Sequence, residues 1–249
     1  MFQPASLKGN SPAPLDERIR LKLIPLYLFV IILSLLPLIT FEYTYFYFLW
    51  GLSYYLLFFI LLPFNAVLSI YILQFSANII SALFLIICKL VYKPKEGEFK
   101  RTIEDKNYKF WNIRNAIKKL PLYLNATNPM PWLKSRFTLR FFGVKIGKNT
   151  ICDNAWISSE FVEIGEDVII GMAVSILSFG MEQDTFMLKK ISIGDHALIG
   201  AKSVLLPGTT IRKKVKLAAL SSTDYEQTLK EGALYSGNPA KLKEKSINE

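Results

Sequence analysis

The chain has 249 residues, of which 51% are hydrophobic, and its formal net charge is +10. One ordinary soluble domain does not need so much apolar character. The excess is also concentrated, since Glu42 is the only charged residue between Leu23 and Cys88. A signal peptide does not fit, because its apolar part is only about 7–15 residues long. The composition therefore predicts a membrane anchor.

A short tail, 1–20, precedes this anchor, which we place at 21–92. The first apolar run has the length of one helix that crosses about 30 Å of hydrocarbon. The second run is too long for one crossing, and Pro63 followed by Asn65 offers a break. The expected transmembrane helices are about 21–41, 45–64 and 67–91. Gln74 and Asn78 in the third could line a polar path or form hydrogen bonds between helices.

The number of crossings, two or three, stays open at this stage. Fifteen Lys and Arg residues against four acids lie between Lys89 and Lys148, which predicts the cytoplasmic side of the cell membrane for this region. Basic residues also precede the first helix, and three crossings would separate the two basic ends. The same charge predicts contact with anionic lipids. No nucleic-acid recognition motif accompanies it, so nucleic acid is not an expected partner.

A basic connector, 93–140, follows the anchor and contains an amphipathic helical pattern. Its apolar positions are Phe110, Ile113, Ile117 and Leu120. Such a helix either lies on the membrane surface or packs on the domain that follows.

A period of six residues dominates 141–222. It runs in two registers: Ile146, Cys152, Ser158, Ile164, Ile170, Ile176, and then Ile193, Ile199, Leu205, Ile211, Leu217. Six is neither a strand period nor a helix period, but it is the length of one side of a triangular coil. We therefore predict a left-handed parallel β-helix of hexapeptide repeats, with Gly after the aliphatic residue to permit the turn.

The registers are separated by a loop, 177–192, which must bulge out of the coil, and a C-terminal tail, 223–249, ends the chain. Insertions in repeat folds collect on binding faces. The chain has one histidine, His196, and two cysteines that lie in different regions, Cys88 and Cys152. No metal site is expected from this set.

The stretch "IGDHALIGAKSVLLPGTTI", followed by "YSGNPAKL", resembles the final coils of hexapeptide-repeat acyltransferases. A narrower resemblance covers about 95–243. There "EGEF", "WNIRNAI", "RFFGVKIGKNT" and "GNPAK" are similar to the membrane-associated repeat domains that end poly-lysine-type nonribosomal peptide synthetases.

The resemblance implies a homotrimer with acyl transfer in clefts between subunits. The donor would be acyl-coenzyme A or a phosphopantetheine thioester, and a loop histidine would act as general base. Here Ser178 and Phe179 occupy that place in the loop. The candidate bases are therefore His196, a corner residue, and the loop acids Glu182 and Asp184.

Three lysines near the loop are candidates for holding the phosphates of the donor, with solubility of an exposed edge as the alternative. They are Lys189, Lys190 and Lys202. The zinc carbonic anhydrases of this fold are excluded, because each of their sites needs three histidines.

Two functions follow. The first is a membrane-bound acyltransferase that moves an acyl group from a thioester to a hydroxyl or amine of a glycan, lipid or peptide. The alternative is a catalytically silent trimeric β-helix, a scaffold or interaction module anchored in the membrane.

Overall fold

The computed structural model describes residues 18–126, 137–152, 154–182 and 184–243. The predicted N-terminal tail, part of the connector and the end of the C-terminal tail lie wholly or partly outside these ranges. Two compact units divide the chain: a helical unit, 17–93 with 110–129, and a repeat unit formed by 94–109 and the chain from 130 onward. Each unit is described by itself.

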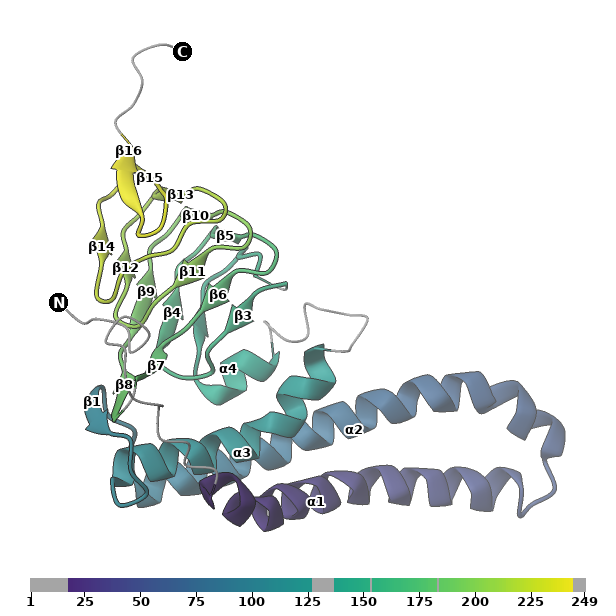
Figure 1. Ribbon diagram of the computed structural model, residues 1–249. Helices are drawn as coiled ribbons and strands as arrows, with labels where there is room; N and C mark the ends of the chain where they lie inside the picture. Colours follow the sequence, from purple (N-terminus) through teal and green to yellow (C-terminus); the bar gives the residue numbers. More distant parts are fainter. Residues whose placement is uncertain (1–17, 127–136, 153, 183, 244–249) are drawn as a thin grey trace. The chain divides into compact units, whose positions relative to one another are not determined.

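The helical unit contains two long helices where the sequence led us to expect three. They are α1 (Arg18–Leu49) and α2 (Tyr55–Val91), joined by residues 50–54 (Figure 1). The predicted break near Pro63 is wrong, because α2 continues through this proline. Breaking the helix would expose several backbone groups in an apolar region, whereas proline removes one hydrogen bond.

The two helices run antiparallel and contact each other along their length. The ring centroids of Phe29 and Phe84 are 5.9 Å apart, and near the other end Tyr45 donates a 2.6 Å hydrogen bond to the carbonyl of Phe58. By length and composition both could cross a membrane, over Leu21–Leu49 and Tyr55–Val91. A pair of antiparallel helices also places both basic ends on the same side, which removes the conflict that three crossings would create.

The isolated carboxylate of the anchor lies between these helices. Asn65 Nδ2 donates to both carboxylate oxygens of Glu42, at 3.1 and 3.0 Å, and Ser69 Oγ donates to one of them. Polar groups in an apolar setting hold helices together in this way. Of the two residues that we singled out in the third predicted helix, Gln74 makes such a bond, from its Nε2 to Asn125 Oδ1. Asn78 is buried, and its Oδ1 has no hydrogen bond.

The connector forms one short strand and a long helix, β1 (Gly97–Lys100) and α3 (Lys106–Ala126). Asp105 caps this helix, since its Oδ1 accepts hydrogen bonds from the backbone N–H groups of Asn107 and Tyr108. Within the helical unit α3 packs on α2: Ser81 Oγ donates a 3.0 Å bond to the carbonyl of Ile117.

The repeat unit is a coil whose successive turns place their short strands in three parallel sheets (Figure 1). The first sheet contains β2 (Lys145–Ile146), β4 (Val162–Ile164), β9 (Ile191–Ile193), β12 (Thr210–Ile211) and β14 (Thr228–Leu229). The second contains β5 (Ile169–Ile170), β10 (Leu198–Ile199), β13 (Lys216–Leu217) and β15 (Leu234–Ser236). The third contains β3 (Trp156–Ile157), β6 (Ser175–Ile176) and β11 (Val204–Leu205).

The aliphatic positions of the repeat pair with their equivalents one coil away, as the period of six predicts. Ile199 is the partner of Leu217, eighteen residues later, and both are buried. One expected position is wrong by a residue: Ile157, not Ser158, pairs with Ile176 and faces the core. The aliphatic side chain takes the inward place because its burial is favourable and that of a hydroxyl is not.

The glycines that follow the aliphatic residues allow neighbouring coils to pack closely. Our prediction that they permit the turns is wrong. A Cβ on Gly194 would lie 2.8 Å from the backbone nitrogen of Lys213, and one on Gly171 would lie 2.6 Å from that of Ala201. The residues with positive φ come three positions after the aliphatic residue, as in Asp167 and His196 at φ 52° and 57°.

The bulging loop is a β-hairpin of β7 (Phe179–Glu182) and β8 (Thr185–Leu188). β1 adds to β8 as a third antiparallel strand, so the connector holds the hairpin. The insertion stretches one coil from eighteen to twenty-nine residues, as the pairing of Ile164 with Ile193 shows.

The ends of the coil are covered differently. α4 (Leu139–Phe142) contacts β2 at the N-terminal end, with Leu139 and Phe142 buried. At the C-terminal end the coil extends past the predicted boundary at 222. β14 and β15 continue the sheets through the segment that we assigned to the tail, and β16 (Lys241–Lys243) pairs antiparallel with β15.

Candidate functional site

Equivalent corners of successive turns stack on one another, so that each forms an edge along the repeat unit. We call the edge between the third and first sheets the hairpin edge, because β7 and β8 leave the coil there, between β6 and β9. The His196 edge lies between the first and second sheets and also carries Asp167. The Lys202 edge lies between the second and third sheets.

The place of the expected loop histidine is structural in this chain. Ser178 is 1% exposed, and its Oγ donates a 2.6 Å hydrogen bond to the carbonyl of Glu160. Its backbone N–H donates to Ser158 Oγ at 3.1 Å. Ser178 therefore closes the start of the hairpin and leaves no reactive group at this position.

Glu182 lies at the far end of β7 and contacts the coil that follows. Tyr225 donates a hydrogen bond from its hydroxyl to Glu182 Oε1 at 3.1 Å. Burial, together with the nearby Glu182 carboxylate, raises the pKa of Tyr225 to about 12. The tyrosine stays a neutral donor at physiological pH and orients the carboxylate. Asp184, the other loop acid, is exposed.

Lys189 ties the hairpin to both of its neighbours. Its Nζ lies 2.7 Å from Glu98 Oε1 of β1 and 2.6 Å from Glu226 Oε1 of a later coil. Partial burial of the ammonium lowers its pKa, but the hydrogen bonds to Glu226 and Glu98 outweigh this effect and raise the pKa overall. The side chain is 19% exposed, so Lys189 is held between two carboxylates.

Lys190 makes a similar connection at the base of the hairpin. Its Nζ lies 2.7 Å from Glu163 Oε2, and its backbone N–H donates to Glu96 Oε2 at 3.0 Å. Lys145 contacts the other oxygen of Glu163 at 2.8 Å. Hydrogen bonds from Lys145 and Lys190 lower the pKa of Glu163.

His196 lies on a different edge from the hairpin and faces solvent. Its Nδ1 is 3.7 Å from Asp167 Oδ2, one coil earlier, and the two side chains are 56% and 45% exposed. A carboxylate near Nδ1 favours the tautomer in which Nε2 accepts a proton. At 3.7 Å the contact is longer than a hydrogen bond, so Asp167 lies beside the imidazole without fixing its orientation.

The three candidate lysines do not form one group. Lys189 and Lys190 lie at the base of the hairpin and pair with carboxylates, whereas Lys202 is exposed at its own corner with φ 56°. An anionic phosphate near the hairpin would compete with Glu98, Glu226 and Glu163 for the two lysines. Within the described ranges, no group of three or more His, Cys, Asp and Glu side chains could hold a metal ion.

Sequence reasoning did not find several partners of the candidate residues. Asp167 could have been found by counting one coil back from His196 and adding the eleven residues of the insertion. Tyr225 and Glu226 were placed in a tail, so their coil was not considered. Glu98 gave no signal, because ninety-one residues separate it from Lys189.

Comparison with known proteins finds a family model that matches part of the repeat unit. The family model described as the hexapeptide repeat of succinyl-transferase matches residues 190–219. The matched segment begins at the end of the hairpin and contains both His196 and Lys202. The resemblance of these coils to hexapeptide-repeat acyltransferases is therefore confirmed.

Two curated relatives cover about half of this chain. Delta-poly-L-ornithine synthetase of Acinetobacter baumannii is 25% identical over 132 residues, which are 52% of this chain and 10% of that protein. YvoF of Bacillus subtilis, a protein with an acetyltransferase name, is 27% identical over 143 residues, 53% of this chain and 82% of its own length. The first match confirms the narrower resemblance, to poly-lysine-type nonribosomal peptide synthetases.

Among solved structures, a maltose O-acetyltransferase from Clostridium difficile 630 is 19% identical. The match has a TM-score of 0.44 and covers 59% of this chain and 91% of that one.

Proposed function

We propose that this protein is a membrane-anchored acyltransferase that moves an acyl group from a thioester to a hydroxyl or amine. The observation that carries the proposal is the match of residues 190–219 to the hexapeptide repeat of succinyl-transferase, directly after a hairpin that interrupts the coil. The acetyltransferase name of a relative supports an acyl donor such as acetyl-coenzyme A, with a carrier-protein thioester as the other possible source. The acceptor class is a glycan, lipid or peptide.

The reaction needs one base in addition to binding groups. The acceptor loses a proton as its oxygen or nitrogen forms a bond to the acyl carbon, the carbon–sulfur bond breaks, and the donor leaves as a thiol after it gains a proton. His196, with Asp167 beside it, is the base we favour, and Glu182, oriented by Tyr225, is the second candidate. Lys202 is exposed and free to approach the phosphates of the donor; Lys189 and Lys190 would have to exchange carboxylate partners first.

The anchor and the assembly complete the proposal. Helices α1 and α2 would hold the protein in the cell membrane, with the repeat unit on the basic, cytoplasmic side. The coil would be left-handed, as its period of six favours, and three chains would associate. Glu182 and His196 lie on different edges of one coil, so a site that used both would need two neighbouring chains.

The direct test measures thiol release from acetyl-coenzyme A by the full chain in lipid nanodiscs, with glycan, lipid and peptide acceptors. If His196 is the base, His196→Ala lowers the rate about 10²–10⁴-fold. Leu220→Ala is a matched control, because Leu220 is also an exposed corner residue with φ 57°. Equal rates for both variants would assign the role to Glu182, which Glu182→Gln and Tyr225→Phe then test.

A second candidate function, a scaffold without catalysis, is favoured by one observation. The hairpin has buried Ser178 where a histidine is expected, and Lys189 ties the same hairpin to its own coil. In that case none of the donors would release thiol above background in correctly assembled wild-type protein, and affinity capture with the full chain should instead recover a partner enzyme.

A further inference from the structure

Helices α1 and α2 form a helical hairpin, and we call the end where α1 begins and α2 ends its base. α3 covers one side of this base. α2 and α3 run antiparallel in this region, which extends along α2 from Gln74 to Tyr92. Three contacts define this packing: Gln74 with Asn125, Ser81 with Ile117, and the stacked rings of Tyr92 and Phe110 at 4.9 Å. All these residues belong to the helical unit, so their arrangement is internal to it.

The cations of α3 make it unfavourable for the side of the helical hairpin that α3 covers to lie in hydrocarbon. Its part in the helical unit contains Arg114, Lys118 and Lys119 and no acidic residue. Cations are among the residues that a membrane interior accepts least. Arg114 and Lys118 are buried and Lys119 is exposed, so a hairpin that stood upright and fully inserted would place the Lys119 ammonium directly in the bilayer.

The part of α2 beyond the reach of α3 has the length of a membrane crossing. It runs from Tyr55 to Leu73, and nineteen helical residues span about 28 Å, close to the hydrocarbon thickness of about 30 Å. Tyrosines and Trp50 gather at its far end, as at a membrane interface.

The opposite side of α2 is apolar along its whole length. We call this face the apolar stripe; its residues recur at helical spacing and are Leu68, Phe75, Ile79, Leu83, Ile86 and Leu90. Those beside α3 remain exposed, Leu83 and Ile86 by 56% each and Leu90 by 82%. Residues toward α3, such as Gln74 and Ser81, are buried instead.

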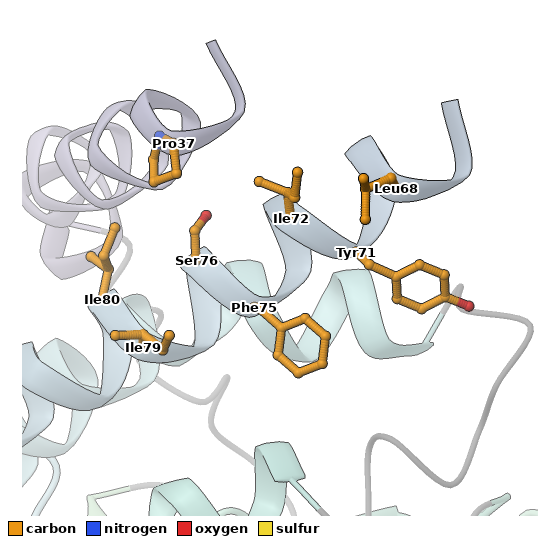
Figure 2. A pocket seen from close by; sticks show the side chains of 8 residues that line it. All are labelled: Pro37, Leu68, Tyr71, Ile72, Phe75, Ser76, Ile79 and Ile80. Carbon is orange, nitrogen blue, oxygen red and sulfur yellow. The ribbon is translucent and has the colours of Figure 1, made fainter. Parts of the chain in front are cut away.

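The stripe also forms one wall of an open apolar groove of about 430 Å³. Pro37 of α1 lies on the other side of this groove, and Tyr71, Ile72 and Phe75 of α2 are among its lining residues (Figure 2). Hydrocarbon chains match such a lining, whereas water would leave it unsatisfied. Contact with hydrocarbon chains therefore favours the apolar stripe even at the level where the cations of α3 favour water or lipid headgroups.

We propose that the hairpin enters the bilayer obliquely, with the apolar stripe against lipid along its full length and α3 at headgroup level on the other side. Upright insertion to the full depth would bury the cations of α3, and upright insertion to half depth would expose Leu83, Ile86 and Leu90 to water. Oblique entry avoids both. The exposed cations of the base, Lys22, Lys93 and Lys119, face anionic headgroups in this orientation.

The inference rests on the proposed membrane anchoring, and one experiment separates the two. Single cysteines replace Leu83, Lys119 and Phe64 in a full chain whose native cysteines are changed to alanine. Leu83 and Lys119 lie on opposite sides, and because α2 and α3 run antiparallel and Ser81 contacts Ile117, Leu83 lies about 6 Å nearer the base than Lys119. Each cysteine receives a nitroxide label, and the protein is placed in vesicles that contain phosphatidylglycerol.

Collision of the nitroxide with dissolved oxygen indicates that the label lies in lipid. Collision with a water-soluble nickel chelate indicates that it lies in water. We expect labels at 64 and 83 to favour oxygen and the label at 119 to favour nickel. Equal exposure at 83 and 119 would overturn oblique entry while leaving the anchor intact. A label at 83 that meets neither reagent and shows broadening between labels would mean that a second copy covers the stripe, which also overturns the proposal. Nickel contact at 64 would instead refute the membrane anchor itself.

Discussion

Single residues of the repeat unit are constrained by the next coil more than by their own backbone conformation. Gly194 illustrates this, since the space for its missing side chain is taken by the backbone of Lys213. The corner residues, by contrast, adopt positive φ yet include Asp167, His196 and Lys202. Their side chains point outward and are exposed to solvent, so the small cost of a left-handed conformation is tolerated at each corner.

The first prediction compares two glycines. Gly194→Ala should lower the free energy of unfolding of the repeat unit by about 1–3 kcal/mol, because the methyl group forces the coils apart. Gly232→Ala meets open space and carries only the strain of its φ of 68°, about 1 kcal/mol. Thermal unfolding of both variants checks the order, and an equal effect would contradict our account of the Ile-Gly pairs.

The second prediction concerns acid stability at Glu163. Because Lys145 and Lys190 lower its pKa in the folded state, the pairing stabilises the fold above the unfolded pKa, about 4.3. The contribution is lost as the pH falls through the lower, folded pKa. Glu163→Gln should therefore lower the free energy of unfolding at pH 7 by up to about 1 kcal/mol, measured by denaturant titration, and should match wild type in stronger acid. A difference that persisted there would show that packing, not charge, is responsible.

At the scale of elements, the sequence predicted what depended on a repeated pattern. The coils, the position of the insertion and the apolar helices all follow from local periodicity. What it could not predict depended on contacts distant in the chain. The pairing of β1 with β8 and the hydrogen bonds of Glu42 with Asn65 have no local signal, because the partners lie far apart in the sequence.

Among the candidate site residues the same division holds. The prediction that His196 lies at a corner is confirmed, because its position follows from the period of six. The engagement of Lys189 by Glu98 and Glu226 could not be foreseen, since it needs the connector and a coil that we had assigned to the tail.

The third prediction tests this attachment of the hairpin. Lys189→Met removes the ammonium and leaves Glu98 and Glu226 without their shared partner, so the hairpin should separate from the coil more often. Amide hydrogen exchange in 179–188 should speed up relative to wild type, while exchange in the later coils stays unchanged. Lys214→Met, at another edge, is the control. Unchanged protection of the hairpin would mean that the β1–β8 ladder holds it alone.

At the scale of the whole molecule, the edges of one coil separate the two candidate bases. His196 and Glu182 lie on different edges of the coil, one in a corner and the other in the hairpin. Association of identical chains in a closed ring is the simplest way to bring different edges together.

The fourth prediction is therefore the assembly itself. Native mass spectrometry of the full chain released from detergent micelles should show three chains per particle. The same sample diluted stepwise should keep this ratio if the interface is specific. A monomer at high micromolar concentration would contradict the trimer, and with it any active site shared between subunits.

The last strand of the coil also bears on how these molecules behave when crowded. A stack of parallel strands ends in unpaired backbone groups, which could template the addition of another chain and lead to fibres. β16 turns back and runs antiparallel to β15, and all three of its residues are exposed, with lysines at both ends. Positive charge on an outermost strand repels a second copy that approaches edge to edge. β16 thus protects the edge of this sheet, so that edge-to-edge addition of another copy is disfavoured even at high protein concentration.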